Sequence, residues 1–442
     1  MEPLLLISPC DGRYNNYTES CRSYFSEYAI QKQRVKIEID YLHYLMQYLP
    51  EFSHITDYSV LHNIITNFDI NECKKIKEIE NVIKHDVKAV EIYIRNILVE
   101  THFKDNVSFI HFGLTSQDIN NVVYPTLIKK FIKDEYMPII ANIILKLNVM
   151  HNNYNNIIML SHTHGQSAVP TTFGKEMKVF SYRLCEALEI LENIEYKCKF
   201  GGASGNLNAH VVAYPHYDWE NFATDFISMY NCRRSKFTTQ IDNYENLSII
   251  FDAIKRINTI LIDLCQDVWL YILKDYLQLE INHNEVGSST MPHKVNPIDF
   301  ENAEGNLGIS NSLLEFMSRK LPISRLQRDL TDSTVLRNIG VSFGHSVIAI
   351  KNIIKGLTKI TPNKQVILYD LYKQTVVLSE GYQTILRKYN MVDAYDKFKD
   401  FTRKNDNLNI EDFKNYIKTL NISDEIKEEL YSINLTNYTG IC

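Results

Sequence analysis

Glycine and proline are scarce in this chain of 442 residues, with 15 and 11 copies respectively, and they are unevenly distributed. None lies between Gly12 and Pro50, between Pro50 and Gly113, or between Pro215 and Gly287. Because these two residues interrupt regular structure most strongly, long spans without them favour long helices. The sequence also has no series of segments in which apolar and polar residues alternate, so strands are not predicted as the main element.

The chain also lacks a strong net charge, paired cysteines and a long uncharged apolar run. The 47 basic and 53 acidic side chains give a net charge of −6, so no overall field would attract nucleic acid. The eight cysteines are scattered without a CxxC pair, which predicts neither a zinc site nor a disulfide framework. The most apolar long stretch, 257–273, contains Asp263 and Asp267, so it is not predicted to span a membrane. The apolar core within residues 1–9 is too short for a signal peptide. We therefore expect a soluble, cytoplasmic protein.

Helical periodicity is the main pattern that the sequence does contain. Apolar residues recur at spacings of three and four through 173–191 and again through 250–272. Such long stripes suit the centre of a long helix bundle, either within one chain or shared between subunits. A chain of this length should form two or three domains. We place the boundaries near His111 and Pro362, which gives the segments 1–111, 112–362 and 363–442.

The segment best suited to chemistry is 287–297, with the sequence GSSTMPHKVNP. Its hydroxyl groups come first, Lys294 and Asn296 follow, and a helix that carries Glu301 is predicted from about Ile298. One loop would thus offer a hydroxyl, backbone N–H donors, a cation and a carboxylate, a combination that suits chemistry on an anion. The same residues could instead form a turn that caps the next helix.

This string resembles the signature loop of the fumarase/aspartase superfamily, GSSxMPxKxNP, at all eight prescribed positions. The resemblance implies an all-α fold of three helical domains, whose long central bundle merges into the core of a homotetramer with shared active sites. It also implies a lyase that releases fumarate. Ser288 would take the proton from carbon, His164 would protonate the departing nitrogen, and Glu301 would orient His164. Lys294 and Asn296 would hold the substrate carboxylate.

Two further strings are similar to the branch of this superfamily that acts on purine nucleotides. In 8–14 (SPCDGRY), Arg13 could hold a phosphate while Tyr14 packs on a sugar or base, although a surface turn would have the same sequence. In 84–91 (KHDVKAVE), the resemblance assigns Lys84, His85 and Asp86 to the substrate, with Lys84 where that branch usually has asparagine. From helix geometry alone, an adjacent histidine and aspartate point to different faces and do not form a dyad.

Two blocks contain paired hydroxyls and paired histidines. In 109–118 (FIHFGLTSQD), Thr115 and Ser116 follow a glycine near a predicted helix start and could cradle a carboxylate or simply cap the helix. The resemblance assigns both to the succinyl group. In 161–166 (SHTHGQ), His162 and His164 are two residues apart and no third ligand is evident, so we predict no metal. The resemblance makes His164 the proton donor, with His162 where arginine is common and Ser167 where proline is common.

The residues best suited to a phosphate lie in 325–338 (RLQRDLTDSTVLRN). Arg328, Ser333 and Arg337 could clamp it, unless the segment is an ordinary helix with surface ion pairs. Gln240, in a Thr-Thr-Gln string, matches a residue that reaches the substrate, and the glycine-rich segment 201–208 would form a nearby loop. The resemblance, which runs from Ser8 to about Asn338, adds substrate contacts at Ser289, Val295, Asn302, Thr334, Val335 and Leu336.

The resemblance therefore implies β-elimination of fumarate from adenylosuccinate, giving AMP, and from SAICAR, giving AICAR, in purine biosynthesis. It implies no cofactor, no nucleic-acid partner and no membrane partner. A rival within the same fold is a lyase acting on argininosuccinate or aspartate, against which the phosphate-binding residues argue. The chain could also be a structural or interaction protein on this fold. A metal-dependent hydrolase built on His162 and His164 lacks ligands.

Overall fold

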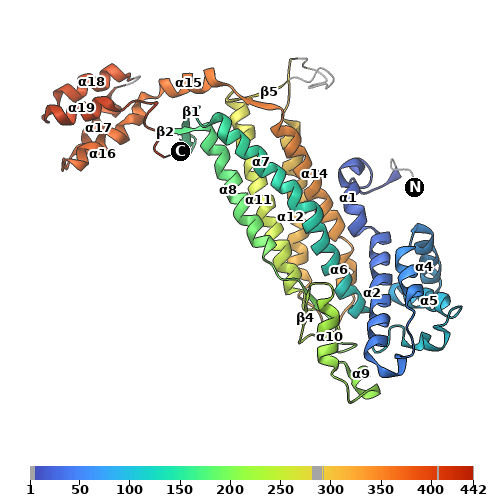
Figure 1. Cartoon of the computed structure of the whole chain (residues 1–442). Coiled ribbons are helices and arrows are strands. Elements are labelled where there is room, and N and C mark those ends of the chain that lie inside the picture. The colour runs from blue at the N-terminus through green and yellow to red at the C-terminus, as the bar shows by residue number, and fades with distance from the viewer. Residues whose placement is uncertain (1–4, 281–290, 292, 406–407, 442) are drawn as a thin grey trace. The chain divides into compact units, whose positions relative to one another are not determined.

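The computed structural model describes residues 5–280, 291, 293–405 and 408–441. The chain is mainly helical, as predicted, and it divides into two compact units that each combine three segments. Unit 1 comprises 1–140, 187–261 and 304–351, and unit 2 comprises 141–186, 262–303 and 352–442. The boundary falls within long helices, which are drawn in Figure 1: α7 (Met137–Tyr154), α8 (Phe173–Glu192), α11 (Glu245–Leu273), α12 (Ile298–Lys320) and α14 (Ile339–Leu357).

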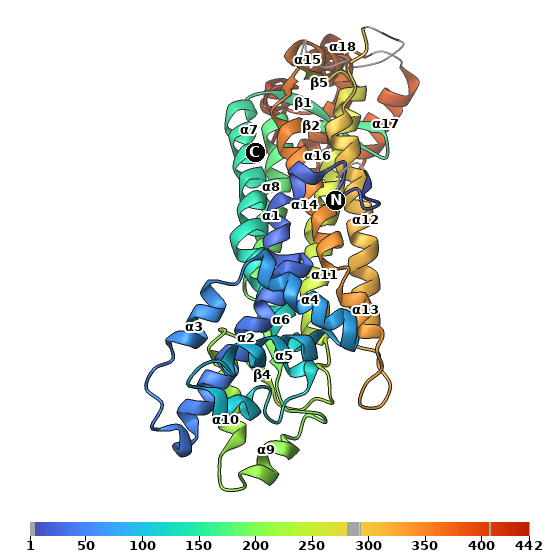
Figure 2. The ribbon, with the colours of Figure 1, turned by 90° about the vertical axis from the view of Figure 1, so that its right-hand side faces the viewer.

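The first part of unit 1 is a group of helices around α2. In chain order the elements are α1 (Asn15–Phe25), α2 (Glu27–Tyr48), η2 (Pro50–Phe52), α3 (Ser59–Thr66), α4 (Ile70–Ile83), α5 (Asp86–Leu98), η3 (Lys104–Phe109), α6 (Ser116–Phe131) and the π-helical turn η4 (Ile132–Tyr136). Side-chain caps start several of them: Ser26 accepts the N–H of Ala29 at α2, and Asp69 accepts two N–H groups at α4. Helix α2 lies beside α4 and α5 (Figure 1) and beside α6 (Figure 2).

The rest of unit 1 comprises β3 (Lys197–Lys199), α9 (Asn208–Ala213), α10 (Trp219–Ser228), β4 (Arg233–Ser235) and α13 (Thr331–Leu336), together with parts of α11, α12 and α14. Strands β3 and β4 form a parallel pair. Asn258, a fully buried polar residue of α11, joins the helices of this unit. Its amide oxygen accepts the hydroxyl of Ser346 on α14 at 2.8 Å, and its amide nitrogen donates to Ser310 on α12 at 3.2 Å.

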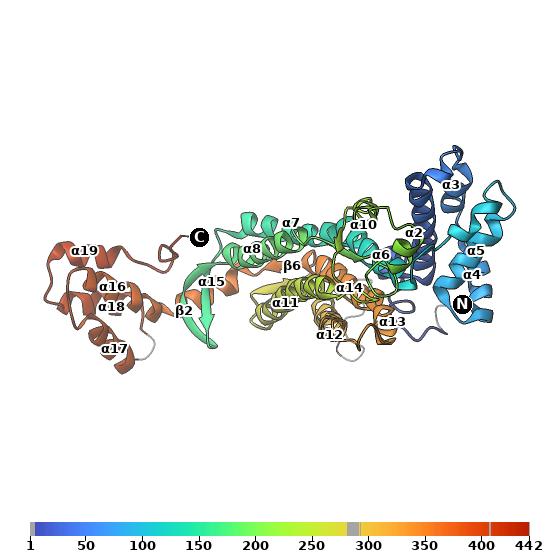
Figure 3. The same cartoon turned by 90° about the horizontal axis from the view of Figure 1, so that it is seen from below.

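Unit 2 contains two antiparallel strand pairs and the C-terminal helices. Strands β1 (Ile158–Thr163) and β2 (Gln166–Thr172) form a hairpin, and β5 (Leu277–Leu279) pairs with β6 (Ile360–Pro362). The remaining elements are α15 (Lys364–Lys373), η5 (Thr375–Leu378), α16 (Ser379–Lys388), α17 (Ala394–Lys404), α18 (Ile410–Thr419) and α19 (Asp424–Ser432). Figure 3 shows α16 to α19 gathered together, and their apolar faces enclose Tyr382, Phe398 and Phe413.

The predicted helical segments agree with the structure. The stripe in 173–191 lies on α8, the stripe in 250–272 lies on α11, and α12 begins at Ile298. Ile250, Ile254, Ile257 and Leu261 are all fully buried. Among the helices of the described residues, none has both the length and the hydropathy that a bilayer crossing requires. The predicted division at His111 and Pro362 stays a prediction.

Candidate active site

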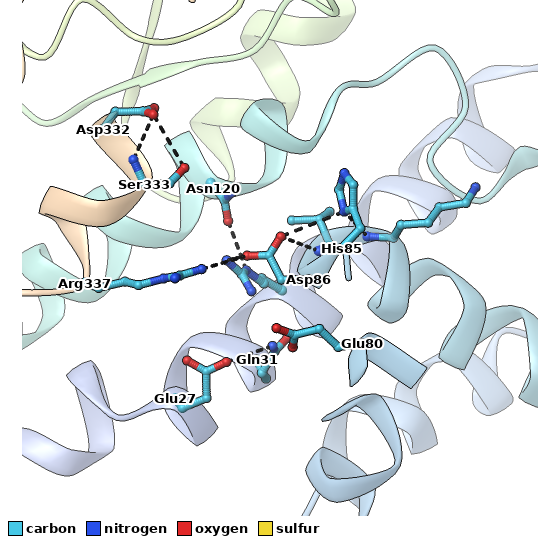
Figure 4. Close-up of polar contacts among 12 residues, drawn as sticks. Glu27, Gln31, Glu80, His85, Asp86, Asn120, Asp332, Ser333 and Arg337 are labelled. Atoms are coloured by element: carbon cyan, nitrogen blue, oxygen red, sulfur yellow. Dashed lines mark hydrogen bonds and ion pairs between the residues drawn. The ribbon is translucent and has the colours of Figure 1, made fainter. Parts of the chain in front are cut away.

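A cluster of charged residues in unit 1 surrounds Asp86, the first residue of α5 (Figure 4). The Asp86 carboxylate accepts a hydrogen bond from Arg34 Nη2 at 2.8 Å and from the Val87 N–H at 2.9 Å, and Arg337 Nη2 lies 3.9 Å away. Burial alone would raise the pKa of the Asp86 carboxyl, but the charge of Arg34 and these hydrogen bonds outweigh it and lower the pKa. Asp86 is therefore ionised at neutral pH and lies between two guanidinium groups.

His85 and Lys84 form the junction between α4 and α5. Lys84 ends α4 in the left-handed region, with φ 57°, a conformation that glycine and asparagine tolerate best among the amino acids. His85 is the N-cap of α5, and its Nδ1 accepts the Lys88 N–H at 3.1 Å. The ring proton of the neutral imidazole is therefore on Nε2. The side chain of His85 is half exposed, so Nε2 can reach a ligand.

The second group of predicted residues in unit 1 lies around Arg328. Its Nη2 donates to the Ser333 hydroxyl at 3.1 Å, and its Nη1 makes a long contact of 3.5 Å with Gln240 Oε1. Arg328 Nε is buried without a hydrogen-bond partner in the part of the chain that the structure describes. Buried Asp332 holds this segment, because it accepts the Ser333 N–H at 2.8 Å and the hydroxyl of Tyr244 at 2.9 Å. The structure thus brings Arg328, Ser333 and Gln240 together, while Arg337, the other arginine of the predicted clamp, lies 3.9 Å from Asp86.

Thr115 and Ser116 lie at the N-terminus of α6, as predicted, with Thr115 as the N-cap residue. Asp118, which is fully buried, anchors this helix end: its carboxylate accepts the Thr115 N–H at 2.8 Å. The same carboxylate binds Lys199 Nζ at 2.7 Å and the N–H groups of Gly201 and Gly202 at 2.8–3.1 Å. The predicted loop 201–208 is therefore tied to the start of α6 through a buried ion pair.

Two histidines, the partly buried His111 and the fully buried His210, support the segment that precedes Thr115. His111 Nδ1 lies 2.7 Å from Glu38 Oε1; burial lowers the pKa of this imidazole, but the Glu38 charge and hydrogen bond more than offset this and raise it. His210 Nε2 lies 2.9 Å from the hydroxyl of Tyr41, and burial lowers the pKa of His210 to about 4, so it is neutral. A Cβ on Gly113 would lie 2.6–2.8 Å from the His210 ring, so only glycine fits between the ring and the loop.

The N-terminal pair occupies the start of α1. Tyr14 is the N-cap residue of this helix, and the exposed Arg13 guanidinium lies 5.9 Å from the Tyr14 ring centroid. Three further residues predicted to contact the substrate lie on α13. Thr334 is exposed, while Val335 and Leu336 are buried. A contact from Val335 or Leu336 to a ligand would therefore use the backbone.

In unit 2, His164 lies at the tip of the β1–β2 hairpin. Thr163 pairs with Gln166, so His164 and Gly165 form a two-residue turn, and both have positive φ (52° and 71°), as a type I′ turn requires. The His164 side chain is exposed. His162, by contrast, packs inward: its Nε2 lies 2.8 Å from Lys274 Nζ, and burial together with the Lys274 charge lowers the pKa of the imidazole. Its neutral Nε2 therefore accepts the hydrogen bond.

Only part of the predicted signature loop lies within the described residues; Ser288 and Ser289 lie outside them. Lys294 and Val295 are exposed, and Asn296 is half-buried. At the start of α12, Glu301 accepts a hydrogen bond from Trp269 Nε1 at 3.1 Å, and Asn302 accepts one from Asn352 at 3.0 Å. Among the described residues, no hydrogen bond joins Glu301 to His164, so the proposed orienting role of Glu301 stays a prediction.

Sequence reasoning missed Arg34, Lys199 and His210, which the structure places directly behind predicted site residues. Arg34 gave one signal, because it interrupts the apolar stripe that includes Ile30 and Ile37 on α2. Lys199 and His210 gave none, since their partners are 81 and 169 residues away in the sequence.

Comparison with known proteins decides the family. A family described as lyase matches residues 12–309, and one described as adenylosuccinate lyase C-terminal matches residues 324–439. The adenylosuccinate lyase of Dictyostelium discoideum is 47% identical over 99% of this chain and 97% of its own length. That of Escherichia coli strain K12 is 40% identical over 100% of this chain and 97% of its own length. The chain belongs to the adenylosuccinate lyase family.

The C-terminal match extends the likeness beyond Asn338, where the motifs recognised in the sequence end. Solved structures agree on the fold alone. A fumarate lyase from Mesorhizobium sp. BNC1 has a TM-score of 0.75 at 15% identity and covers 96% of this chain and 95% of that chain. A 3-carboxy-cis,cis-muconate lactonizing enzyme from Pseudomonas putida has a TM-score of 0.74 at 15% identity, and the match covers 97% of this chain and 95% of that chain. The predictions of an all-α, fumarase/aspartase-like fold and of a lyase are therefore confirmed.

Proposed function

We propose that this lyase cleaves adenylosuccinate to AMP and fumarate, and SAICAR to AICAR and fumarate, in purine nucleotide biosynthesis. The observation that carries the proposal is the cationic group of unit 1. Arg328 has a buried Nε without a partner among the described residues and reaches Ser333, while Arg337 is 62% exposed. A phosphate would supply the acceptors that these guanidinium groups lack. Argininosuccinate carries no phosphate, so it would bring no phosphate oxygen to Arg328 Nε.

The chemical step that we infer is β-elimination with two proton transfers. Ser288 takes the proton from the carbon that bears a carboxylate, and His164 gives a proton to the nitrogen as the carbon–nitrogen bond breaks. Lys294 and Asn296 stabilise the carboxylate on which negative charge accumulates. The exposure of His164 at a hairpin tip supports its role, because an acid in this position can reach a substrate bound to another surface.

We also propose that the active protein is a homotetramer in which subunits share active sites. Large apolar side chains on the long helices are exposed in the single chain, including Leu145 on α7, Tyr182 on α8 and Leu273 on α11, each at least 60%. Exposed large apolar side chains on long bundle helices suit subunit interfaces. Glu301 would then meet the His164 of another subunit. A cytoplasmic location stays a prediction.

The first test is the absorbance of the purified protein mixed with adenylosuccinate, in parallel with argininosuccinate. Loss of the adenylosuccinate spectrum with one fumarate released per substrate supports the proposal. Turnover of argininosuccinate alone would refute the assignment of the phosphate residues, and inactivity on both would revive a structural role.

Shared sites have their own test. A His164→Ala variant and a Ser288→Ala variant should each be almost inactive, whereas a mixture that has exchanged subunits should recover part of the activity. Near-normal turnover of Ser288→Ala would remove serine as the base, and no recovery in the mixture would argue that each site belongs to one subunit.

A further inference from the structure

Arg34 is a buried cation behind the candidate phosphate site, and the proposed reaction gives it no role. It lies on the buried face of α2, beside Ile30 and Ile37, and its side chain is only 5% exposed. Its Nε donates to Asn120 Oδ1 on α6 at 3.0 Å, and its Nη2 donates to Asp86 Oδ2 at 2.8 Å. A guanidinium that is removed from water must be paired, so these two contacts fix its position.

Asp86 is the charged partner of Arg34, because the other acidic side chains nearby pair with other residues. Glu27, on the same helix, accepts from Gln31 at 3.2 Å and from Lys77 at 3.0 Å, and Lys77 also binds Glu80 at 2.6 Å (Figure 4 shows Glu27, Gln31 and Glu80 beside the cluster). Among the described residues, the carboxylate within ion-pair distance of Arg34 is that of Asp86.

The same oxygen of Asp86 faces a second arginine. Arg337 Nη2 lies 3.9 Å from Asp86 Oδ2, at the limit of an ion pair, whereas Arg34 Nη2 lies at 2.8 Å. The two guanidinium groups differ in access: Arg34 is buried, and Arg337 is 62% exposed. Figure 4 shows Arg337 reaching toward Asp86. The charge of Asp86 is thus already neutralised by the buried Arg34, and the contact of Asp86 with Arg337 is weak.

This arrangement sets the charge that a ligand meets. With Arg34 in place, the two arginines and Asp86 carry a net charge of about +1, which favours a phosphate. Without Arg34 the net charge is about zero, and Asp86 would complete its pairing with the exposed Arg337. We propose that Arg34 is a positioning residue that neutralises Asp86, so that Arg337 stays available for the phosphate of the substrate. This inference rests on the proposed function, because it assumes that Arg337 binds phosphate.

The experiment compares the binding of AMP with that of adenosine, which lacks the phosphate, by titration calorimetry on the full-length protein. In Arg34→Met, we expect the Kd for AMP to rise about tenfold, because Asp86 would then pair with Arg337 and compete with the phosphate for its guanidinium. The Kd for adenosine should change less than twofold. The KM for adenylosuccinate should rise in parallel with the Kd for AMP, while kcat should stay within about threefold.

A matched control is Arg95→Met, because Arg95 lies on α5 and also pairs with a carboxylate, that of Glu91 at 2.7 Å, rather than with Asp86. It should leave both affinities unchanged. Adding Asp86→Asn supplies the decisive comparison: in that background, Arg34→Met should change the Kd for AMP less than twofold, because no carboxylate remains to recruit Arg337. A purely structural role would give the same loss in both backgrounds.

Equal losses for AMP and adenosine in Arg34→Met would overturn the inference, and so would unchanged affinity for AMP. If the methionine variant does not fold, Arg34→Lys decides: it keeps the charge but cannot reach Asp86 and Asn120 together, so AMP should weaken two- to fivefold with adenosine unchanged. Failure of the unmodified protein to bind AMP would count against the proposed function itself. Binding by the unmodified protein with no effect of Arg34 substitutions would count only against the role of Arg34.

Discussion

Replacing Asp118 by asparagine tests the buried ion pair that joins the start of α6 to the loop after β3. Both Asp118 and Lys199 have fully buried side chains, and their charged atoms lie 2.7 Å apart. Asparagine keeps the shape but removes the charge, so the Lys199 ammonium would have neutral acceptors alone, such as the carbonyl oxygen of Gly202 at 2.7 Å. Breaking a buried pair from one side usually costs about 3–5 kcal/mol.

Lysine itself sets an upper limit to this cost. Burial lowers the pKa of Lys199, and the charge of Asp118 partly opposes this effect. Without Asp118, the amine can lose its proton, which removes the cost of burying an unpaired charge. From an ordinary lysine pKa, neutralisation at pH 7.5 costs about 4 kcal/mol. We therefore expect a local destabilisation of roughly 3–4 kcal/mol, which corresponds to about a 10²–10³-fold change in a local opening equilibrium.

Amide hydrogen exchange measures this local opening directly, because the N–H groups of Gly201 and Gly202 donate to the Asp118 carboxylate. Mass spectrometry of peptides from the loop should show exchange about 10²–10³-fold faster in Asp118→Asn than in the unmodified protein. Lys199→Met should have a smaller effect, since Asp118 keeps three backbone donors, including the Thr115 N–H. Acceleration below tenfold in Asp118→Asn would show that the pair does not hold the loop.

Three further predictions concern the same unit. Lys84→Gly should stabilise the end of α4 by about 1 kcal/mol, because glycine adopts φ 57° without strain, and slower amide exchange in the last turn of α4 would confirm it. Gly113→Ala should lower the melting temperature and the activity, since its Cβ would lie 2.6–2.8 Å from the ring of His210; an unchanged melting temperature would contradict this geometry. The raised pKa of His111 means that its protonation stabilises the folded state fully below the unfolded pKa of about 6.5, and that this contribution is lost as pH rises through the raised value. The difference in unfolding free energy between the unmodified protein and His111→Gln should therefore be largest near pH 6 and shrink toward pH 8, and a constant difference would disprove the linkage.

The sequence predicts the helices well because periodicity is a local property. The stripes that form α8 and α11 can be counted from the residues themselves, and the proline at 297 marks the start of α12. The predicted site residues of unit 1 were likewise found from short strings, and the structure brings Arg328, Ser333 and Gln240 into one group.

The residues behind the site could not be predicted, since their pairing is set by packing between distant segments. Asp118 meets Lys199 across 81 residues of sequence, and Arg34 meets Asp86 across 52. The positions of Lys199 and Arg34 in the sequence do not indicate which residue each will pair with, because the pairs form only when distant segments pack together. No hydrogen bond joins Glu301 to His164 in the described part of the chain, so their pairing stays a prediction.

The division into two interleaved units has a consequence for synthesis. Unit 1 begins with residues 1–140 but needs residues 304–351 to complete it. A ribosome that adds about 5–20 residues per second would take roughly 10–40 s between residues 140 and 351. During that time Phe25 of α1 and Phe131 of α6 lack Phe343 of α14, whose ring lies 5.2 and 5.0 Å from theirs in the folded unit. The nascent chain should therefore depend on chaperones until α14 has been made.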